Sequence, residues 1–252
     1  MKKGLIIILV LMLLLSNRLY SQIDTVDIKT NDTVSAKFPL KKIIIPAALI
    51  SYGIASRISN PVRRLDYKIA GEVAKHNKYS TKIDDYMQYA SHAAVFGIDL
   101  LGVKAKHKLL DRTFIVATSG VITALCVQTL KRTTLVRRPD GSDSYSFPSG
   151  HTATAFAGAH ILFKEYKDES LLIGIAGYGM ALTTGCMRML NNKHWLSDIA
   201  AGAGIGMASV ELSYLFLPAW NRLLGLKNKN KKLVIIPVIS KTQTSFGLVY
   251  SF

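Results

Sequence analysis

The sequence predicts an all-α, membrane-embedded helical bundle of about five or six membrane-associated helices, followed by a short β-like tail. Of its 252 residues, 49% are hydrophobic and 19% are charged, and the mean hydropathy is +0.24. The apolar residues gather in runs separated by polar loops, as they do in helices that enter a bilayer. A chain of this length is long enough for one domain with a sizeable core.

The N-terminus has the order of a secretory signal peptide. Two lysines precede an apolar run from Leu5 to Leu15, and a short polar stretch ends at Ser21 and Gln22. We therefore predict a signal peptide over residues 1–21, with an uncleaved anchor helix as the alternative. Residues 22–37, rich in Thr, Asp and Ser, form a polar lead segment. In either case the chain is expected to be exported or inserted in a membrane.

The net charge of +16 comes from 32 Lys and Arg residues against 16 Asp and Glu residues. Such an excess attracts polyanions, including nucleic acid, anionic lipid headgroups and phosphorylated substrates. The sequence has no zinc-finger or RNP-like pattern and no basic helix with interleaved aromatic residues. The expected partners are therefore the membrane bilayer and a phosphorylated lipid, not nucleic acid, and the oligomeric state stays open.

Residues 38–226 are expected to form the helical domain, which opens with two different helices. Residues 38–58 read as a spanning or membrane-buried helix, and neighbouring helices can tolerate its kink at Pro46. In residues 60–90, apolar residues recur at three- and four-residue steps, which predicts an amphipathic helix on the membrane surface. A solvent-facing helix of a soluble bundle is the alternative for this second segment.

Five more apolar segments follow, at about 89–105, 112–130, 152–163, 170–187 and 196–218. Several are shorter than the ~20 residues of a straight span, and the first of them carries His92 and Asp99. Cys126 and Cys186 lie inside these runs, and we expect both to pack between helices as small hydrophobic residues and not to form a disulfide.

Residues 227–252 change character and form the predicted tail. A basic patch, "KNKNKK" at 227–232, precedes β-branched and aromatic residues on either side of a Lys-Thr-Gln-Thr-Ser turn, which predicts a hairpin. A terminal aromatic residue such as Phe252 also ends many outer-membrane barrels, but one hairpin cannot make a barrel. An outer-membrane location is therefore the less favoured one.

Three polar clusters lie in the connections between apolar segments: "KRTTLVRRP" at 131–139, "PSGH" at 148–151 and "RMLNNKHWLSD" at 188–198. Lys131, Arg138 and Arg188 supply three cations that could converge on one dianionic group. Ser149 and Gly150 come just before a predicted helix start, where unpaired backbone N–H groups favour an anion. Two intervening helices return the chain to the same side, so the clusters can meet.

The third cluster also offers a catalytic pair. His194 and Asp198 are four residues apart and share one face of a helix. A carboxylate on one imidazole nitrogen fixes the tautomer, which leaves the other nitrogen free as a nucleophile, and His151 can then act as the proton donor. Taken singly, each motif also fits a solvated loop, a helix cap or a surface ion pair. The other histidines, which we expect to be structural or exposed, are His76, His92, His107 and His160.

Together the three motifs resemble the signature of the type 2 phosphatidic acid phosphatases (PAP2), which share a superfamily with the vanadium haloperoxidases. The resemblance implies a PAP2-type bundle in which His194 forms a phosphohistidine, Asp198 orients it and His151 protonates the leaving group. It also implies a metal-independent reaction without a cofactor, with vanadate as an inhibitor. The phosphoryl oxygens would be held by Lys131, Arg138, Ser149, Gly150 and Arg188.

One position departs from the signature, because the family usually has serine where this chain has Met187. Behind the site, the small residues of "TATAF" at 152–156 are expected to allow close helix packing. Residues 140–147, "DGSDSYSF", are expected to be a flexible spacer at the mouth of the site.

The expected function is hydrolysis of a phosphate monoester or pyrophosphate on a lipid of the lipid A, undecaprenyl pyrophosphate, phosphatidylglycerophosphate or phosphatidate class. Export favours the bacterial inner membrane with a site that faces the periplasm. If every segment spans and the signal is cleaved, however, the motifs fall on the cytoplasmic side, so one segment such as 89–105 must lie flat or half-inserted. The alternatives are a vanadate-dependent haloperoxidase and a non-catalytic membrane protein that binds anionic lipid.

Overall fold

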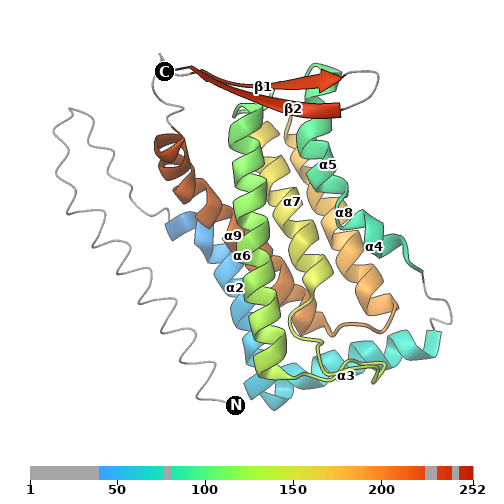
Figure 1. The fold of residues 1–252 in the computed structure, drawn as a ribbon. Helices are drawn as coiled ribbons and strands as arrows, with labels where there is room; N and C mark the ends of the chain where they lie inside the picture. The colour runs from blue at the N-terminus through green and yellow to red at the C-terminus, as the bar shows by residue number, and fades with distance from the viewer. Residues whose placement is uncertain (1–39, 77–80, 225–231, 240–243, 252) are drawn as a thin grey trace, which may run out of the picture.

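The chain forms the predicted bundle of helices in a computed structural model, which describes residues 40–76, 81–224, 232–239 and 244–251. The predicted signal peptide, the polar lead segment and all but the last residue of the basic patch lie outside the described residues. The longest helices run side by side (Figure 1), and α9 packs against α2, α6 and α7. These helices are α2 (Leu40–Ile58), α6 (Leu109–Thr134), α7 (Gly150–Tyr166), α8 (Leu171–Leu190) and α9 (Leu196–Leu223).

The helix α3 (Asn60–His76) follows α2 after a bend of 95° and lies across one end of the bundle (Figure 1). The amphipathic helix predicted for residues 60–90 is therefore confirmed in its first half only. In the second half, residues 77–80 lie outside the described residues, and the short helix α4 (Ile83–Met87) follows them. The bend allows α3 to cover the end of the bundle where α8 ends and α9 begins.

The apolar segment expected at 89–105 is not a spanning helix. It forms α5 (Ala90–Gly97) and the 3-10 helix η1 (Ile98–Leu101), which ends at Gly102 with a left-handed φ of 85°. Asp99 accepts hydrogen bonds from Arg112 and from the Tyr166 hydroxyl, so this polar residue fixes a break inside the apolar run. A helix of 8 residues is far shorter than the ~20 that a span requires.

Not all of the long helices qualify as membrane spans by length and composition. In the described part of the chain, α6 and α9 are long and apolar enough to cross a membrane, and α2 with α3 adds a third if this bent pair is one span. The outer faces of α6 and α8 expose large apolar side chains, among them Leu125 at 65% and Leu172 at 75%. In a membrane protein such faces contact lipid.

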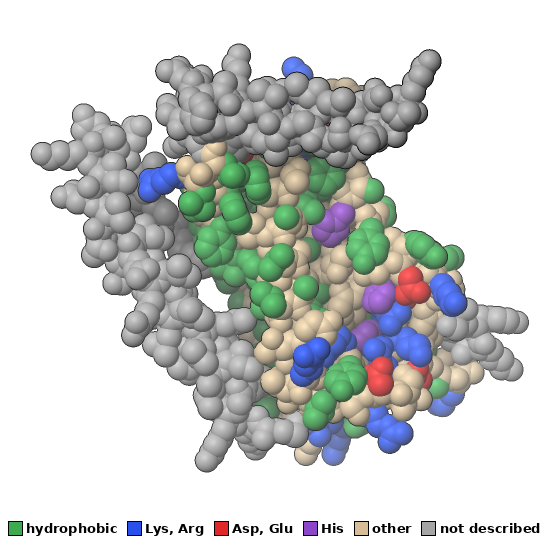
Figure 2. All heavy atoms as spheres, in the orientation of Figure 1, with side chains coloured by type: hydrophobic (Ala, Val, Ile, Leu, Met, Phe, Trp, Pro, Cys, Tyr) green, Lys and Arg blue, Asp and Glu red, His purple; other side chains and the backbone are tan. Residues whose placement is uncertain are grey.

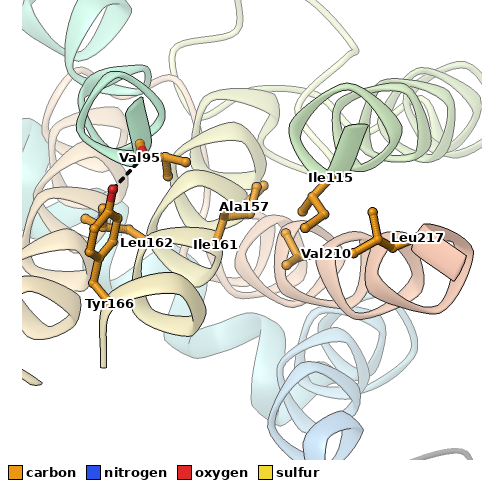
Figure 3. Packing of buried hydrophobic residues seen from close by; sticks show 8 residues of the cluster. All are labelled: Val95, Ile115, Ala157, Ile161, Leu162, Tyr166, Val210 and Leu217. Carbon is orange, nitrogen blue, oxygen red and sulfur yellow. Dashed lines mark hydrogen bonds between the residues drawn. The ribbon is translucent and has the colours of Figure 1, made fainter. Parts of the chain in front are cut away.

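The interior is closely packed between helices α5, α6, α7 and α9 (Figure 3). The residues of this cluster are Val95, Ile115, Ala157, Ile161, Leu162, Tyr166, Val210 and Leu217. Near the start of α7, glycines of α9 let the two backbones approach closely. A Cβ atom on Gly202 would lie 2.5 Å from the Ser149 carbonyl oxygen, and one on Gly206 would lie 2.2 Å from that of Ala153. This close approach, expected from the small residues at 152–156, holds the start of α7 against α9.

The tail forms the predicted hairpin, in which β1 (Lys232–Ile239) pairs antiparallel with β2 (Thr244–Ser251). Both cysteines are free, as expected, but only Cys126 is partly buried. The prediction that Cys186 packs between helices is wrong, because this side chain lies on an exposed face of α8.

Candidate active site

The three sequence clusters meet at the end of the bundle next to α3, where α6 and α8 end and α7 and α9 begin. Leu135 ends α6 in a left-handed conformation with φ 49°, and Asn192 turns the chain between α8 and α9 with φ 53°. These turns return the chain to the same end of the bundle (Figure 1). On the face shown in Figure 2, most of the visible Lys, Arg, Asp and Glu side chains gather toward this end, and hydrophobic side chains gather farther up the bundle.

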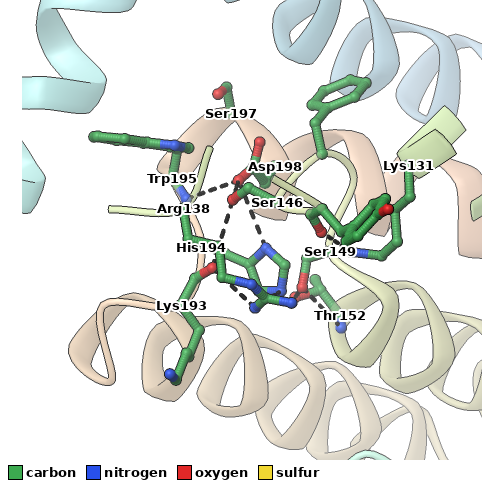
Figure 4. A network of polar contacts seen from close by, with 12 residues as sticks. Lys131, Arg138, Ser146, Ser149, Thr152, Lys193, His194, Trp195, Ser197 and Asp198 are labelled. Carbon is green, nitrogen blue, oxygen red and sulfur yellow. Dashed lines mark hydrogen bonds and ion pairs between the residues drawn. The ribbon is translucent and has the colours of Figure 1, made fainter. Parts of the chain in front are cut away.

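His194 lies at the centre of the site, with an imidazole that is almost entirely buried. Its Nε2 atom is 3.5 Å from Arg138 Nη1, and its Nδ1 atom is 3.6 Å from Asp198 Oδ2 (Figure 4). Burial lowers the pKa of His194 to about 4; the Asp198 carboxylate opposes this shift, and Lys131 and Arg138 add to it. The imidazole is therefore neutral at pH 7, between a carboxylate and a guanidinium group.

Asp198 is fully buried and held by the elements on both sides of it. Its Oδ2 atom accepts hydrogen bonds from the Trp195 backbone N–H at 2.9 Å and from the Ser146 hydroxyl. Its Oδ1 atom has no hydrogen-bond partner in the described part of the chain, and the nearest cation, Arg57 Nη2, is 3.9 Å away. Asp198 thus has a fixed orientation toward His194, and its Oδ1 atom can still accept hydrogen bonds.

The three predicted cations lie around this pair, and each has other partners. Arg138 donates from Nε to Asp143 at 2.8 Å and from Nη1 to the Lys193 carbonyl at 3.2 Å, while Lys131 donates to the Tyr145 carbonyl. Arg188 donates from Nη1 to Asp84 at 2.6 Å, but its buried Nε has no partner among the described residues. The site therefore has more hydrogen-bond donors on its cations than its own carboxylates occupy.

The start of α7 has the predicted form, and the Ser149 hydroxyl takes part in capping the helix. Ser149 caps the helix: its Oγ lies 2.9 Å from Thr152 Oγ1 and 3.4 Å from the Thr152 backbone nitrogen. Its own backbone N–H donates to the Asp198 carbonyl at 3.0 Å. The serine thus joins α7, which starts at Gly150, to α9.

His151 pairs with a residue that sequence reasoning missed. Its Nε2 atom lies 2.9 Å from Asp85 Oδ1, and its side chain is 29% exposed. The neighbouring Asp84 is fully buried and binds both Arg188 and Asn191. The signal was present in "KIDDYM", a pair of acids in a strongly basic chain, but nothing in the sequence connects this pair to a site about 65 to 105 residues away.

The expected flexible spacer at 140–147 is instead a built part of the site. Asp143 binds the Arg138 side chain and also accepts from the Tyr145 backbone N–H at 2.7 Å. Ser146 is fully buried against Asp198. The spacer prediction is wrong because short Asp and Ser side chains bond to nearby backbone and so order a loop of polar composition.

A second network, also missed, links the site to the bend between α2 and α3. Asp66 of α3 accepts hydrogen bonds from the Ser197 backbone N–H at 3.0 Å and the Ser197 hydroxyl at 2.6 Å. Arg57 of α2 donates to Asp66 at 3.0 Å and also contacts Ser197. Asp66 therefore fixes the first turn of α9, the turn that carries Asp198.

The remaining histidines lie apart from this constellation. His160 lies 2.7 Å from Glu211, His107 lies 2.9 Å from Glu165, His92 is near Gly158, and His76 is exposed. In the part of the chain that the structure describes, no group of three or more His, Cys, Asp or Glu side chains is placed to hold a metal ion.

Comparison with known proteins points to one family. A family model described as the PAP2 superfamily matches residues 108–222. Over 172 residues the chain is 33% identical to the lipid A 1-phosphatase of Porphyromonas gingivalis. The match covers 68% of this chain but only 36% of that protein. The chain thus spans little more than a third of the length of this curated relative.

Two solved structures are also similar. The transmembrane PAP2-type phosphatidylglycerolphosphate phosphatase of Bacillus subtilis matches with a TM-score of 0.48 and 19% identity, over 71% of this chain and 97% of that one. LpxE of Aquifex aeolicus matches with a TM-score of 0.42 and 22% identity, over 55% of this chain and 90% of that one.

Proposed function

We propose that the protein is a metal-independent lipid phosphatase of the PAP2 superfamily, whose family model matches residues 108–222. The observation that carries the proposal is the position of His194. One ring nitrogen faces Asp198 at 3.6 Å and the other faces Arg138 at 3.5 Å, in a buried site where the ring stays neutral. A neutral imidazole with one nitrogen directed at a cation has the geometry of a nucleophile aimed at a bound phosphate.

In the proposed first step, His194 Nε2 attacks the phosphorus atom and forms a nitrogen–phosphorus bond. The bond from phosphorus to the lipid oxygen breaks, and this oxygen takes a proton from His151. The Asp198 carboxylate stabilises the positive charge that develops on the imidazole ring. Water then attacks the phosphohistidine, His151 takes the proton of the water, and inorganic phosphate leaves while His194 returns to its neutral form.

The phosphoryl oxygens are bound in this proposal by cations and backbone N–H groups, which stabilise the charge of the transition state. Arg138 places Nη1 beside the attacking nitrogen, and Arg188 offers an Nε that has no partner among the described residues. Lys131 adds a third charge, and Ser149 and Gly150 supply the start of α7. Vanadate, which mimics pentacoordinate phosphorus, is expected to compete for this site.

The proposed substrates are lipids with a phosphate monoester or a pyrophosphate, of the lipid A, undecaprenyl pyrophosphate, phosphatidylglycerophosphate or phosphatidate class. The 33% identity to a lipid A 1-phosphatase supports this range. The proposed location is the bacterial inner membrane, with the site facing the periplasm. The short helices of residues 90–101 support this orientation, because they remove one of the crossings that would have placed the motifs on the cytoplasmic side.

The test is phosphate release by the purified full chain from a panel of these lipids, with EDTA present throughout. Release from at least one lipid, inhibited by vanadate, is the expected result. A protein that is folded in detergent and releases phosphate from none of them contradicts the proposal.

A further inference from the structure

A large cavity adjoins the proposed active site and has no role in the mechanism described so far. Its volume is about 1110 Å³, and it lies between the α2–α3 bend, the end of α6 and the loop that follows α6. Arg138 belongs to both the cavity wall and the site, so the cavity begins where the phosphate site ends. Cavities of about 300–1,000 Å³ hold drug-sized ligands, so this one has room for a lipid headgroup.

The cavity wall carries four arginines and two aspartates, and most of these groups are already paired. Asp66 is bound by Arg57 and Ser197. Partial burial acts to raise the pKa of Asp140, but hydrogen bonds from Lys193 and Ser142 lower it to about 2. The lining charged residues are Arg57, Arg63, Arg137, Arg138, Asp66 and Asp140. Both carboxylates are thus neutralised by the protein, which leaves the cavity positive.

The arginines of the wall differ in whether they are available. Arg57 is held by Asp66, and Arg63 donates to the carbonyls of Ser56 and Arg57 at the end of α2. Arg138 is bound to Asp143. Within the described part of the chain, the Arg137 guanidinium has no hydrogen bond or ion pair. Arg137 directly precedes Arg138, which the proposed mechanism uses to bind phosphate.

The local structure holds Arg137 in place without using its charge. Its carbonyl accepts a hydrogen bond from the Trp195 indole at 2.9 Å, and that indole packs edge-on to Tyr67 at 5.1 Å. Opposite its guanidinium lies Gly141, which has φ +72°. A Cβ atom at this glycine would come within 3.2 Å of Arg137 Nη2. The glycine therefore both permits the turn and leaves room for the guanidinium.

We infer that this cavity is a subsite for a second anionic group of the lipid substrate, with Arg137 as its main cation. The inference rests on the proposed function. A free guanidinium binds phosphate through paired N–H donors, and the rings of Tyr67 and Trp195 offer a wall for the uncharged part of the headgroup. The enzyme should therefore prefer a lipid that carries a second phosphate beyond the scissile one over a lipid with a single phosphate.

The test compares phosphatidylglycerophosphate, which has a second phosphate, with phosphatidate of the same acyl chains. In Arg137→Gln, kcat/KM for phosphatidylglycerophosphate should fall about tenfold, the effect of losing one charge-assisted contact, while kcat/KM for phosphatidate stays unchanged. Arg132→Gln, which removes an exposed arginine from the same helix end but not from the cavity, should change neither value.

An equal change for both lipids, or no change for either, overturns the subsite. If the wild type releases phosphate from neither lipid, the proposed function fails for these substrates, and binding then tests the subsite alone. His194→Ala protein in detergent should bind phosphatidylglycerophosphate about tenfold more tightly than phosphatidate, and adding Arg137→Gln should remove the difference. Equal affinities of the two lipids for the His194→Ala protein contradict the inference.

Discussion

Among the described residues, the bundle buries a histidine beside a carboxylate in two places, and the two clusters differ in how completely they are paired. In the cluster of His160, Glu211, Lys164 and Tyr178, the histidine lies 2.7 Å from one Glu211 oxygen and Lys164 donates to the other at 2.7 Å. The Tyr178 hydroxyl lies at the second ring nitrogen of His160. Each side-chain polar atom of this cluster has a partner.

The cluster at His194 leaves several polar atoms without one. In the described part of the chain, His194 Nδ1, Asp198 Oδ1 and Arg188 Nε are all buried without a hydrogen bond. Buried polar groups are normally satisfied, and each exception lowers the stability of the fold. The first cluster therefore joins α7, α8 and α9, whereas the second leaves hydrogen-bond donors and charge unpaired, as expected of a ligand site.

The largest expected effect tests the cluster at His194. In His194→Ala, phosphate release should fall by about 10⁴-fold or more, because the proposed nucleophile is lost, while the thermal midpoint in detergent changes little. Steady-state assay and a melting curve on the same preparation measure both. Retained turnover in this variant would assign the nucleophile elsewhere.

A change in the cluster of His160 and Glu211 should lower stability and leave activity nearly unchanged. Glu211→Gln leaves His160 and Lys164 without their shared carboxylate, and breaking such a buried pair costs about 3–5 kcal/mol of unfolding free energy. Activity per folded molecule should stay near the wild-type value. Glu169→Gln, on an exposed side chain, is the control for the charge change. A Glu211→Gln protein that is stable but inactive would show that stability and activity are not divided between the two clusters.

The contact between α7 and α9 should be sensitive to a single methyl group. Gly206→Ala places a Cβ 2.2 Å from the Ala153 carbonyl oxygen, so the helices must separate, at a cost of about 1–3 kcal/mol. Because the same contact holds the start of α7 at the site, activity should fall as well. Gly120→Ala, where nothing lies within 4 Å of the new Cβ, should be neutral or stabilising. Equal melting temperatures for the two variants would contradict the close packing.

The pH dependence should report the burial of His194. Its pKa of about 4 lies below the usual 6.5, and the neutral ring is the proposed nucleophile, so protonation of His194 should not reduce kcat/KM as the pH falls from 7 to 5. The loss assigned to this group should come near pH 4. A limb near pH 6.5 that disappears in Asp198→Asn would show instead that His194 titrates as an exposed histidine.

The smallest effect is expected at Met187, where the family usually has serine. The side chain is partly buried next to Arg188, and Met187→Ser should add one hydroxyl near the phosphate. Because one neutral hydrogen bond contributes about 1 kcal/mol, kcat/KM should rise by no more than about fivefold. A large loss of activity would show that the methionine has a packing role.

The sequence predicted the parts of the site that lie within continuous motifs. His194 and Asp198 are four residues apart, and the order of the three clusters was enough to place Arg138 beside them. Asp84 and Asp66 were missed because they reach the site from elements about 100 or more residues away, through contacts that only the folded chain creates.

Hydropathy was also a partial guide to the fold. It located every long helix, but it treated residues 89–105 as one segment, although Asp99 binds Arg112 and Tyr166 and breaks the run. It also placed Cys186 inside the bundle, since an apolar residue that faces outward in a membrane protein looks the same in sequence as one in the core.

The most direct measurement is detection of the covalent intermediate. A lipid substrate labelled with radioactive phosphate, mixed with the enzyme and quenched in base during turnover, should leave acid-labile label on a peptide that contains His194. His151→Ala should release phosphate more slowly, and His194→Ala should carry no label. Label on a different residue, or rapid turnover without any labelled protein across all quench times, would contradict nucleophilic catalysis by His194.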